Sequence, residues 1–183
     1  MIDVTREDHI ASCNDYLDAR TGTYEQRAVR YRHAASLMML AGLDDSDTVV
    51  DVGAGWTEFD YTLRAEFGWK GRYIPIDGGI DGVDLEVWEP PRRADWFIAL
   101  EILEHIHTPY LLAVAMKEKA DKGVMFSTPN PETTDVLAMD DTHVIEVSKR
   151  MMERYGFTVT EQTFYGGRFS GGKPDSLFGM WLR

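Results

Sequence analysis

Cysteine is nearly absent from this sequence of 183 residues, in which Cys13 is the only one. A single thiol excludes an internal disulfide framework and fits a reducing compartment, so we expect a cytoplasmic protein. No apolar run approaches the roughly 20 residues that a membrane span needs. The acidic start, M-I-D-V-T-R-E-D, is also unlike a secretory signal peptide. We therefore expect no membrane partner.

Basic residues are scarce relative to acidic ones. The chain has 19 Lys and Arg against 31 Asp and Glu, a formal net charge of −12. A protein that wraps duplex DNA needs a basic face, so this charge balance argues against such a partner, although contact with a nucleic-acid end stays open. The Gly-Lys-Ser/Thr run of P-loop proteins is absent as well. The length indicates one domain that can bury roughly 70% of its unfolded surface.

The stretch 48–59, T-V-V-D-V-G-A-G-W-T-E-F, carries the first strong pattern. Its V-V-D-V run has the β-branched residues of a buried parallel strand. Gly53 and Gly55 follow, where the backbone must turn sharply or approach a ligand closely. A helical pattern then begins at Glu58. Strand, Gly-x-Gly turn and helix together predict a nucleotide-binding βα unit.

The residues around this turn favour one class of ligand. The dinucleotide fingerprint needs a third small residue three places after its second glycine, where this chain has Glu58. A carboxylate at the helix N-terminus would repel a pyrophosphate, which leaves a nicotinamide reductase as a distant alternative. A ligand that is cationic and lacks phosphates, such as S-adenosylmethionine, suits an acidic turn better.

Asp51, Gly53 and Gly55 resemble motif I of the class I S-adenosylmethionine-dependent methyltransferases, acidic-x-Gly-x-Gly-x-Gly. Thr57 replaces the third glycine, and we expect its hydroxyl to cap the helix that follows. The resemblance implies that Asp51 and the turn Gly53-Ala54-Gly55 bind the cofactor.

Residues 69–77, W-K-G-R-Y-I-P-I-D, predict a second strand that ends on Asp77. In the resembled family an acidic residue here accepts hydrogen bonds from both ribose hydroxyls. The resemblance therefore implies that Asp77, with Gly78 beside it, binds the cofactor. The alternative is an aspartate that only forms the turn before the glycines.

Residues 81–88, D-G-V-D-L-E-V-W, predict a third, short strand. By the same resemblance, an acidic residue near the end of this strand faces the adenine amino group. We assign Asp84 to that role, with Leu85 against the ring, and Asp81 is the alternative to Asp84.

A second strong pattern, A-L-E-I-L-E-H-I-H-T-P, spans residues 99–109 at the end of an apolar strand. The run L-E-x-L-E-H, followed later by S-T-P-N-P, resembles one branch of the methyltransferases. That branch contains ubiquinone-type O-methyltransferases and the 2′-O-methyltransferases of small-RNA 3′ ends. Ligands of open α/β sheets bind at the carboxyl ends of the strands, so Leu100 and Glu101 are also cofactor candidates.

If one helical turn follows this strand, Glu101, Glu104 and His105 share a face, and His143 from an acidic loop can reach back to it. The small-RNA branch holds Mg²⁺ with such a set, whereas imidazole ligands would suit Mn²⁺ better. A cation there would lower the pKa of an acceptor hydroxyl. Two alternatives stay open: His105 as a general base without metal, and a cluster that is purely structural.

These patterns together predict an α/β fold: a Rossmann-like, seven-stranded, mostly parallel sheet with a C-terminal antiparallel β-hairpin and helices on both faces. We expect residues 1–46 to form a helical segment that lids the site, with a short helix at 5–18 and a longer amphipathic one from about residue 24. Residues 47–183 would be the methyltransferase domain. By resemblance, three side chains of the lid are candidate substrate contacts: Tyr24, Arg30 and Tyr31.

The expected function is S-adenosylmethionine-dependent O-methylation, with Glu104, His105 and His143 as catalytic candidates. The acidic charge favours a small hydroxylated acceptor over a nucleic acid. One alternative is metal-dependent 2′-O-methylation of an RNA 3′ end. Another is a non-catalytic, cofactor-binding interaction protein, which the replacement of a motif glycine by Thr57 would suit.

Overall fold

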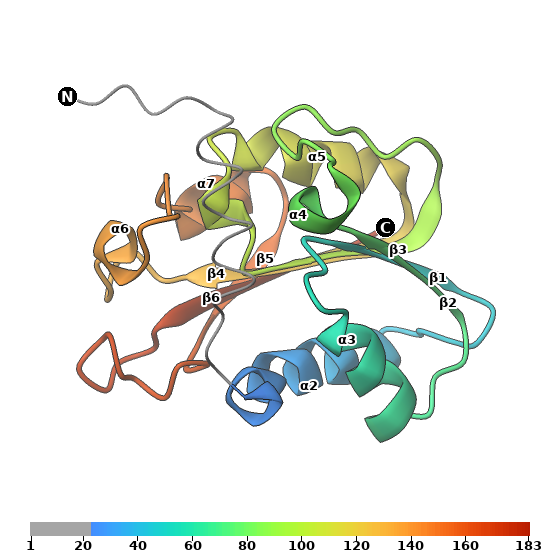
Figure 1. The fold of residues 1–183 in the computed structure, drawn as a ribbon, viewed down its shortest axis with the longest axis horizontal. Helices are drawn as coiled ribbons and strands as arrows, with labels where there is room; N and C mark the ends of the chain where they lie inside the picture. Colours follow the sequence, from blue (N-terminus) through green and yellow to red (C-terminus); the bar gives the residue numbers. More distant parts are fainter. Residues whose placement is uncertain (1–22) are drawn as a thin grey trace.

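A computed structural model describes residues 23–183 and arranges them as one mixed sheet between layers of helices (Figure 1). The sheet order is β2-β1-β3-β4-β6-β5, with β6 antiparallel to both of its neighbours and the other pairs parallel. Its strands are β1 (Thr48–Val52), β2 (Arg72–Ile76), β3 (Ala94–Leu100), β4 (Ala120–Pro129), β5 (Thr158–Gln162) and β6 (Ser176–Leu182). The predicted α/β fold with its C-terminal hairpin is confirmed. The helix expected at 5–18 lies outside the described residues.

The sheet has six strands in the described part of the chain, not the seven expected, because residues 81–88 form no strand. The carbonyl of Ile76 accepts hydrogen bonds from the backbone N–H groups of Gly53 and Ala54, at 2.7 and 3.2 Å, so it faces β1. Since successive residues of a strand alternate in direction, Pro75 faces the open edge, where it has no N–H to donate. A seventh strand on this edge would therefore lack a hydrogen bond.

Two helical layers cover the sheet (Figure 1). On one face lie α2 (Tyr24–Leu40), α3 (Glu58–Tyr61) and the π-helical turn η1 (Thr62–Glu66); on the other lie α4 (Gly78–Asp81), α5 (Pro109–Lys119) and α7 (Lys149–Arg154). Each layer packs against the sheet in a separate hydrophobic core, because alternate residues of β4 point to opposite faces. Phe126 lies in the core between the sheet and α5 (the α5 core), and Met125 lies in the core between the sheet and α2 (the α2 core).

Helix α2 confirms the amphipathic helix predicted before the first strand. Its buried face contains Ala28, Tyr31, Ala35 and Met38, as the apolar spacing requires. With 17 residues it is the longest helix between residues 23 and 183, and no helix there has the length and apolar composition needed to cross a bilayer.

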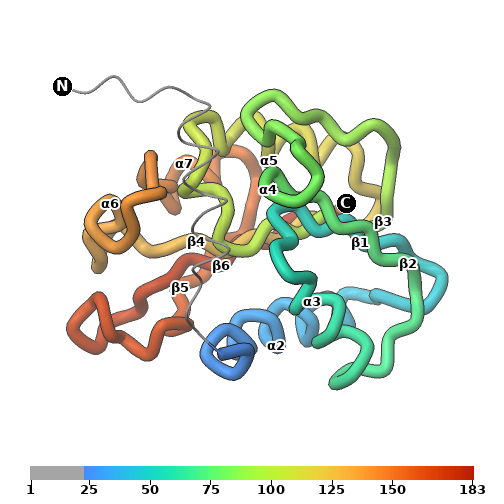
Figure 2. The backbone as a smooth tube through the Cα atoms, in the orientation of Figure 1, coloured from blue at the N-terminus to red at the C-terminus, as the bar shows by residue number. Residues whose placement is uncertain are grey.

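The carboxyl ends of the parallel strands face the irregular segments of the chain. The segment after β4, which contains α6 (Val136–Met139), and the loop between β5 and β6 lie at the same end of the sheet (Figure 2). The short 3₁₀ turn η2 (Leu103–His105) follows β3 directly. Ligands of open α/β sheets bind at this edge, so these segments frame the candidate site.

Replacing Gly179 by alanine should destabilise the sheet by about 1–3 kcal/mol, because a Cβ there would overlap the ring of Phe126 on the neighbouring strand. Urea unfolding of both proteins measures the loss. In a Phe126→Leu background the same substitution should cost less, since the smaller side chain yields the space. Equal costs in the two backgrounds would contradict this packing.

Candidate active site

The turn after β1 makes close approaches that only glycine allows. Gly53 has φ +77°, and a Cβ on it would lie 2.5 Å from Cγ1 of Ile102, in the turn after β3. Gly55 donates its backbone N–H to Oδ2 of Asp77 at 2.8 Å. The Gly-x-Gly turn is thus tied to the ends of both neighbouring strands, β2 and β3.

Asp77 holds this turn and the next helix together. Its other oxygen, Oδ1, accepts the N–H groups of Gly79 and Ile80 at 2.9 and 3.3 Å, which caps α4. Asp77 stands at the end of β2, as the sequence predicts, and its side chain is buried. Both oxygens therefore already accept backbone hydrogen bonds, and a bond to a ligand's ribose would use their remaining lone pairs.

Thr57 and Glu58 differ from expectation. Thr57 precedes α3 in a left-handed conformation with φ +58°, and its hydroxyl makes no capping bond, so the predicted cap is wrong. The Glu58 carboxylate pairs with the Arg27 guanidinium, whose Nε lies 2.7 Å from Oε2, and accepts the Tyr31 hydroxyl at 3.0 Å. The charge of Glu58 is thus compensated, which weakens the electrostatic argument against a pyrophosphate at this helix. The other argument against a dinucleotide, the absence of the third glycine of its fingerprint, is unchanged.

Asp51 is fully buried within β1 and accepts a hydrogen bond from the hydroxyl of Tyr73 on β2. Burial raises the pKa of its carboxyl to about 7, against the opposing effect of that bond, and the nearby charge of Asp77 adds to the rise. Asp51 is therefore a carboxyl that changes charge near neutral pH.

The proposed adenine residues lie on a turn instead of a strand. Asp84 accepts the N–H of Glu86 at 3.0 Å, and Leu85 is buried in the α5 core. Glu86 fastens this turn to the start of α5, where its carboxylate accepts the N–H of His107 at 2.5 Å and the hydroxyl of Thr108 at 2.9 Å. This attachment replaces the strand pairing that was expected to hold residues 81–88.

Glu101 follows β3 in a left-handed conformation with φ +56°. Its Oε1 accepts the hydroxyl of Ser127 at 2.7 Å, and its Oε2 accepts the hydroxyl of Tyr165. Nη1 of Arg30, from α2, lies 3.2 Å from the same Oε2. Leu100, just before Glu101, packs into the α2 core.

The three catalytic candidates come together on η2 and the loop after α6. One carboxylate oxygen of Glu104 and one nitrogen each of His105 and His143 lie within 4.8 Å of one another. Nδ1 of His143 lies 2.6 Å from the carbonyl of Val136, and Nδ1 of His105 lies 3.1 Å from that of Thr142. A neutral imidazole that donates from Nδ1 carries its lone pair on Nε2, which is the form that binds metals.

Glu104 is the buried member of this cluster. Thr128 donates its hydroxyl to Oε2 at 3.0 Å, whereas Oε1 is buried and has no hydrogen-bond partner among residues 23–183. Burial raises the pKa of the carboxyl to about 7, opposed by the hydrogen bonds and by the charge of Arg30. A buried carboxylate oxygen without a donor, beside two imidazoles, suits a divalent cation.

Glu101 does not belong to this cluster. Its partner Ser127 and the partner of Glu104, Thr128, are consecutive residues of β4 and therefore point to opposite faces of the sheet. The two carboxylates thus lie on opposite sides of the sheet edge. Of the four expected metal ligands, Glu104, His105 and His143 come together, whereas Glu101 pairs with Arg30.

Several partners of these residues carried no local signal in the sequence. Tyr165 is 64 positions from Glu101, and Tyr73 is 22 positions from Asp51. Ser127 and Thr128 belong to the recognised S-T-P-N-P run, so that motif could have indicated them. Arg30 was expected to contact substrate, which stays a prediction, and the structure places its guanidinium against Glu101.

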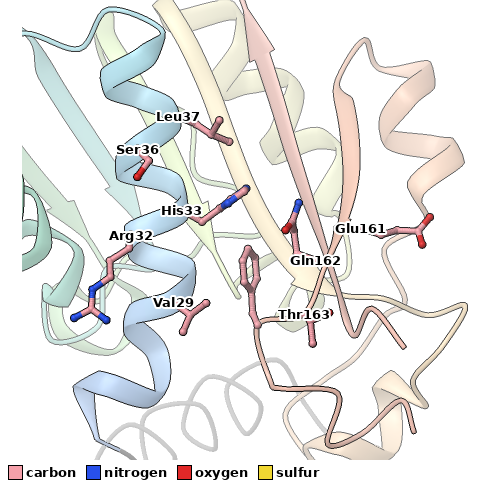
Figure 3. A pocket seen from close by; sticks show the side chains of 9 residues that line it. Val29, Arg32, His33, Ser36, Leu37, Glu161, Gln162 and Thr163 are labelled. Carbon is pink, nitrogen blue, oxygen red and sulfur yellow. The ribbon is translucent and has the colours of Figure 1, made fainter. Parts of the chain in front are cut away.

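A separate groove of about 550 Å³ lies between α2 and the end of β5 (Figure 3). His33 and Leu37 of α2 line one side, and Gln162 and Thr163 the other. None of the candidate cofactor or metal residues is among the described residues that line it. The groove is therefore distinct from the candidate active site.

No protein-family model matches this chain, and neither does any curated protein sequence. Solved structures share its fold. A SAM-dependent methyltransferase from Archaeoglobus fulgidus superposes with a TM-score of 0.60 at 17% identity, covering 88% of this chain and 95% of that one. A chain of the complex between the Haloferax volcanii Trm112 methyltransferase activator and the putative methyltransferase gives 0.62 at 14%, covering 96% and 94%.

A third similar structure is the magnesium protoporphyrin IX methyltransferase from Synechocystis PCC 6803 with bound SAM, with a TM-score of 0.55 at 12% identity, covering 96% of this chain and 97% of that one. Identities this low show a common fold and no more. The α/β sheet of this chain is thus the Rossmann-like arrangement found in these methyltransferases.

Proposed function

We propose that this protein is an S-adenosylmethionine-dependent methyltransferase that acts on a hydroxyl group. The observation that carries the proposal is the alignment of three features at adjacent strand ends: Asp77 after β2, the Gly53–Gly55 turn after β1 and Glu101 after β3. The fold shared with methyltransferases supports it.

The residues present fit this cofactor. Gly53 has a positive φ, and without a side chain it lets the turn after β1 pack closely on Ile102, so that the turn lies between the ends of β2 and β3 where ligands of such sheets bind. Asp77 would hold the ribose hydroxyls, and Asp84 with Leu85 the adenine. The sulfonium supplies a methyl group on a good leaving group, so the protein's part is to align the acceptor and to remove its proton.

The Glu104–His105–His143 cluster would hold a divalent cation beside the acceptor. The orphaned Oε1 of Glu104 and the two Nδ1-anchored imidazoles fit Mn²⁺ or a similar ion, and a Mg²⁺ site is the less suited alternative. Such an ion lowers the pKa of a hydroxyl. Without metal, His105 would itself accept the acceptor's proton as a general base.

A small hydroxylated molecule is the acceptor that the net charge of −12 supports. Residues 1–46 would close over it as a lid; the structure describes residues 23–46 of this segment, in which α2 packs on one face of the sheet. The alternative acceptor is an RNA 3′ end, which the Glu104–His105–His143 cluster also suits. Turnover of an RNA acceptor should fall steeply with salt, whereas turnover of a neutral small molecule should not.

Binding of S-adenosylhomocysteine, measured by calorimetry, tests the proposal. Micromolar binding together with methyl transfer to a hydroxylated acceptor would support it. Binding without transfer across a broad acceptor panel would favour the non-catalytic interaction protein. Indifference to this ligand, or binding of NADH in its place, would refute the proposal.

Glutamine at position 104 should lower the affinity for Mn²⁺ at least tenfold, because it replaces the buried anionic ligand with a neutral one. In the wild type, affinity should rise with pH up to about 7 and then level off, since Glu104 must lose its proton to bind. Isothermal titration at several pH values measures both. Glu89→Gln, an exposed glutamate, is the control; equal affinities in the two variants would exclude the site.

A further inference from the structure

The loop after α6 holds the Glu104–His105–His143 cluster from one side. The backbone carbonyl of Glu104 accepts the N–H of Val144 at 2.9 Å. The backbone N–H of His143 is donated to the carbonyl of Asp140 at 3.1 Å. This loop therefore fixes the backbone of two members of the cluster, and it holds the third, His105, through its side chain.

Asp140 and Thr142 form a short chain of hydrogen bonds that ends on His105. Oδ1 of Asp140 accepts the backbone N–H of Thr142 at 2.9 Å and its hydroxyl at 2.6 Å. The hydroxyl oxygen of Thr142 lies 3.0 Å from Nδ1 of His105, and the carbonyl of Thr142 lies 3.1 Å from the same nitrogen. Thr142 is only 4% exposed, so bulk water has little access to these bonds.

A count of the protons in this chain fixes the state of the Nδ1 atom. Carboxylate and carbonyl oxygens can only accept hydrogen bonds, and a hydroxyl has one proton to donate. Because the hydroxyl proton of Thr142 goes to Asp140, its oxygen must accept from His105. The carbonyl of Thr142 requires the same donor. Both contacts place a proton on Nδ1, which leaves the lone pair of the neutral ring on Nε2.

We propose that Asp140, acting through Thr142, is a positioning residue that sets the tautomer and the direction of the His105 ring. Nε2 is then the atom that binds the cation or takes the acceptor's proton, so this inference rests on the proposed function. A hydroxyl that already donates to a carboxylate is a stronger acceptor, which favours the Nδ1–H form over the Nε2–H form that free histidine prefers in water. Such an outer partner also raises the basicity of the ligating nitrogen.

Nitrogen NMR of the full chain in EDTA, at about pH 8.5 where an ordinary imidazole is neutral, reports the tautomer directly. Protonated and unprotonated ring nitrogens have widely separated shifts, and His105→Gln identifies the signals. We expect the proton on Nδ1 in the wild type and in Thr142→Ser, which keeps the hydroxyl. In Thr142→Val the Nε2–H form should appear. A wild type with its proton on Nε2 would overturn the proposal, whichever variants fold.

Calorimetry with Mn²⁺ measures the consequence for the cluster. Thr142→Val should lower the affinity about tenfold or more, and Asp140→Asn by a smaller factor, because the outer partners of ligating histidines typically contribute at least that much. Asp141→Asn is the matched control: it removes the same charge at the adjacent, exposed position and should leave the affinity unchanged. Equal affinities in Asp140→Asn and Asp141→Asn would overturn the role of Asp140.

A separate titration with S-adenosylhomocysteine distinguishes this inference from the proposed function. A wild type that binds this ligand but carries the His105 proton on Nε2 would refute the positioning role alone. A wild type with the expected tautomer that does not bind the ligand would refute the proposed function, and with it the catalytic role of this arrangement.

Discussion

Replacing Asp77 by alanine should weaken the binding of S-adenosylhomocysteine at least a hundredfold. The substitution removes the acceptor for two ribose hydroxyls, and hydrogen bonds to a charged group contribute roughly 1.5–3 kcal/mol each. It also leaves the N–H groups of Gly55, Gly79 and Ile80 without their carboxylate. We therefore expect a loss of about 2–4 kcal/mol in the free energy of unfolding as well.

Because the two effects share one side chain, the titration should be done at a temperature at which Asp77→Ala is fully folded. Asp60→Ala is the matched control. Asp60 lies two residues after Glu58 on α3, close in sequence to the glycine turn, and pairs with Arg64 in a partly exposed i,i+4 contact. Such contacts contribute at most about 1 kcal/mol, so this variant should bind the ligand normally. Equal affinities for the two variants would show that Asp77 only holds the turn.

The parts of this structure that the sequence predicted are those with local signals. The V-V-D-V run, the two glycines and the apolar spacing of α2 each depend on neighbouring residues and appear where expected. The prediction of a third strand at residues 81–88 was wrong. A strand there would have to pair with the open edge of β2, and that pairing depends on which way Pro75 faces. That direction follows from the register with β1, which no local pattern contains.

The candidate site was predictable in its residues and less so in their grouping. The predicted cluster forms, with Glu104, His105 and His143 close together. The turn η2 holds Glu104 and His105 at the end of β3, and the loop after α6 brings His143 to the same place. Glu101 separates from them because its partners, Arg30 and Tyr165, are 71 and 64 positions away along the chain. Contacts of that range decide which way a side chain at a turn points.

Asparagine at position 51 should make the protein more stable at pH 8 than the wild type, by at most about 4 kcal/mol. The pKa of Asp51 is raised by burial from 3.8 to about 7, roughly three units at 1.36 kcal/mol each. Between these values the folded protein holds a proton that the unfolded chain releases. Stability therefore falls as pH rises from about 4 to 7, and it stays low above 7. Asparagine cannot ionise, so its curve should lack this decline.

Urea unfolding at pH 5 and at pH 8 measures the difference between the two proteins, which should be small at the lower pH and largest at the higher one. The exposed Asp45→Asn is the control and should change neither value.

Part of the wild-type decline should persist in Asp51→Asn, because Glu104 titrates in the same range with the same sign. Tyr73→Phe removes the hydrogen bond that favours the ionised Asp51, so it should steepen the decline in the wild type and have no pH-dependent effect in Asp51→Asn. A pH-independent difference between wild type and Asp51→Asn would mean that Asp51 is ionised throughout.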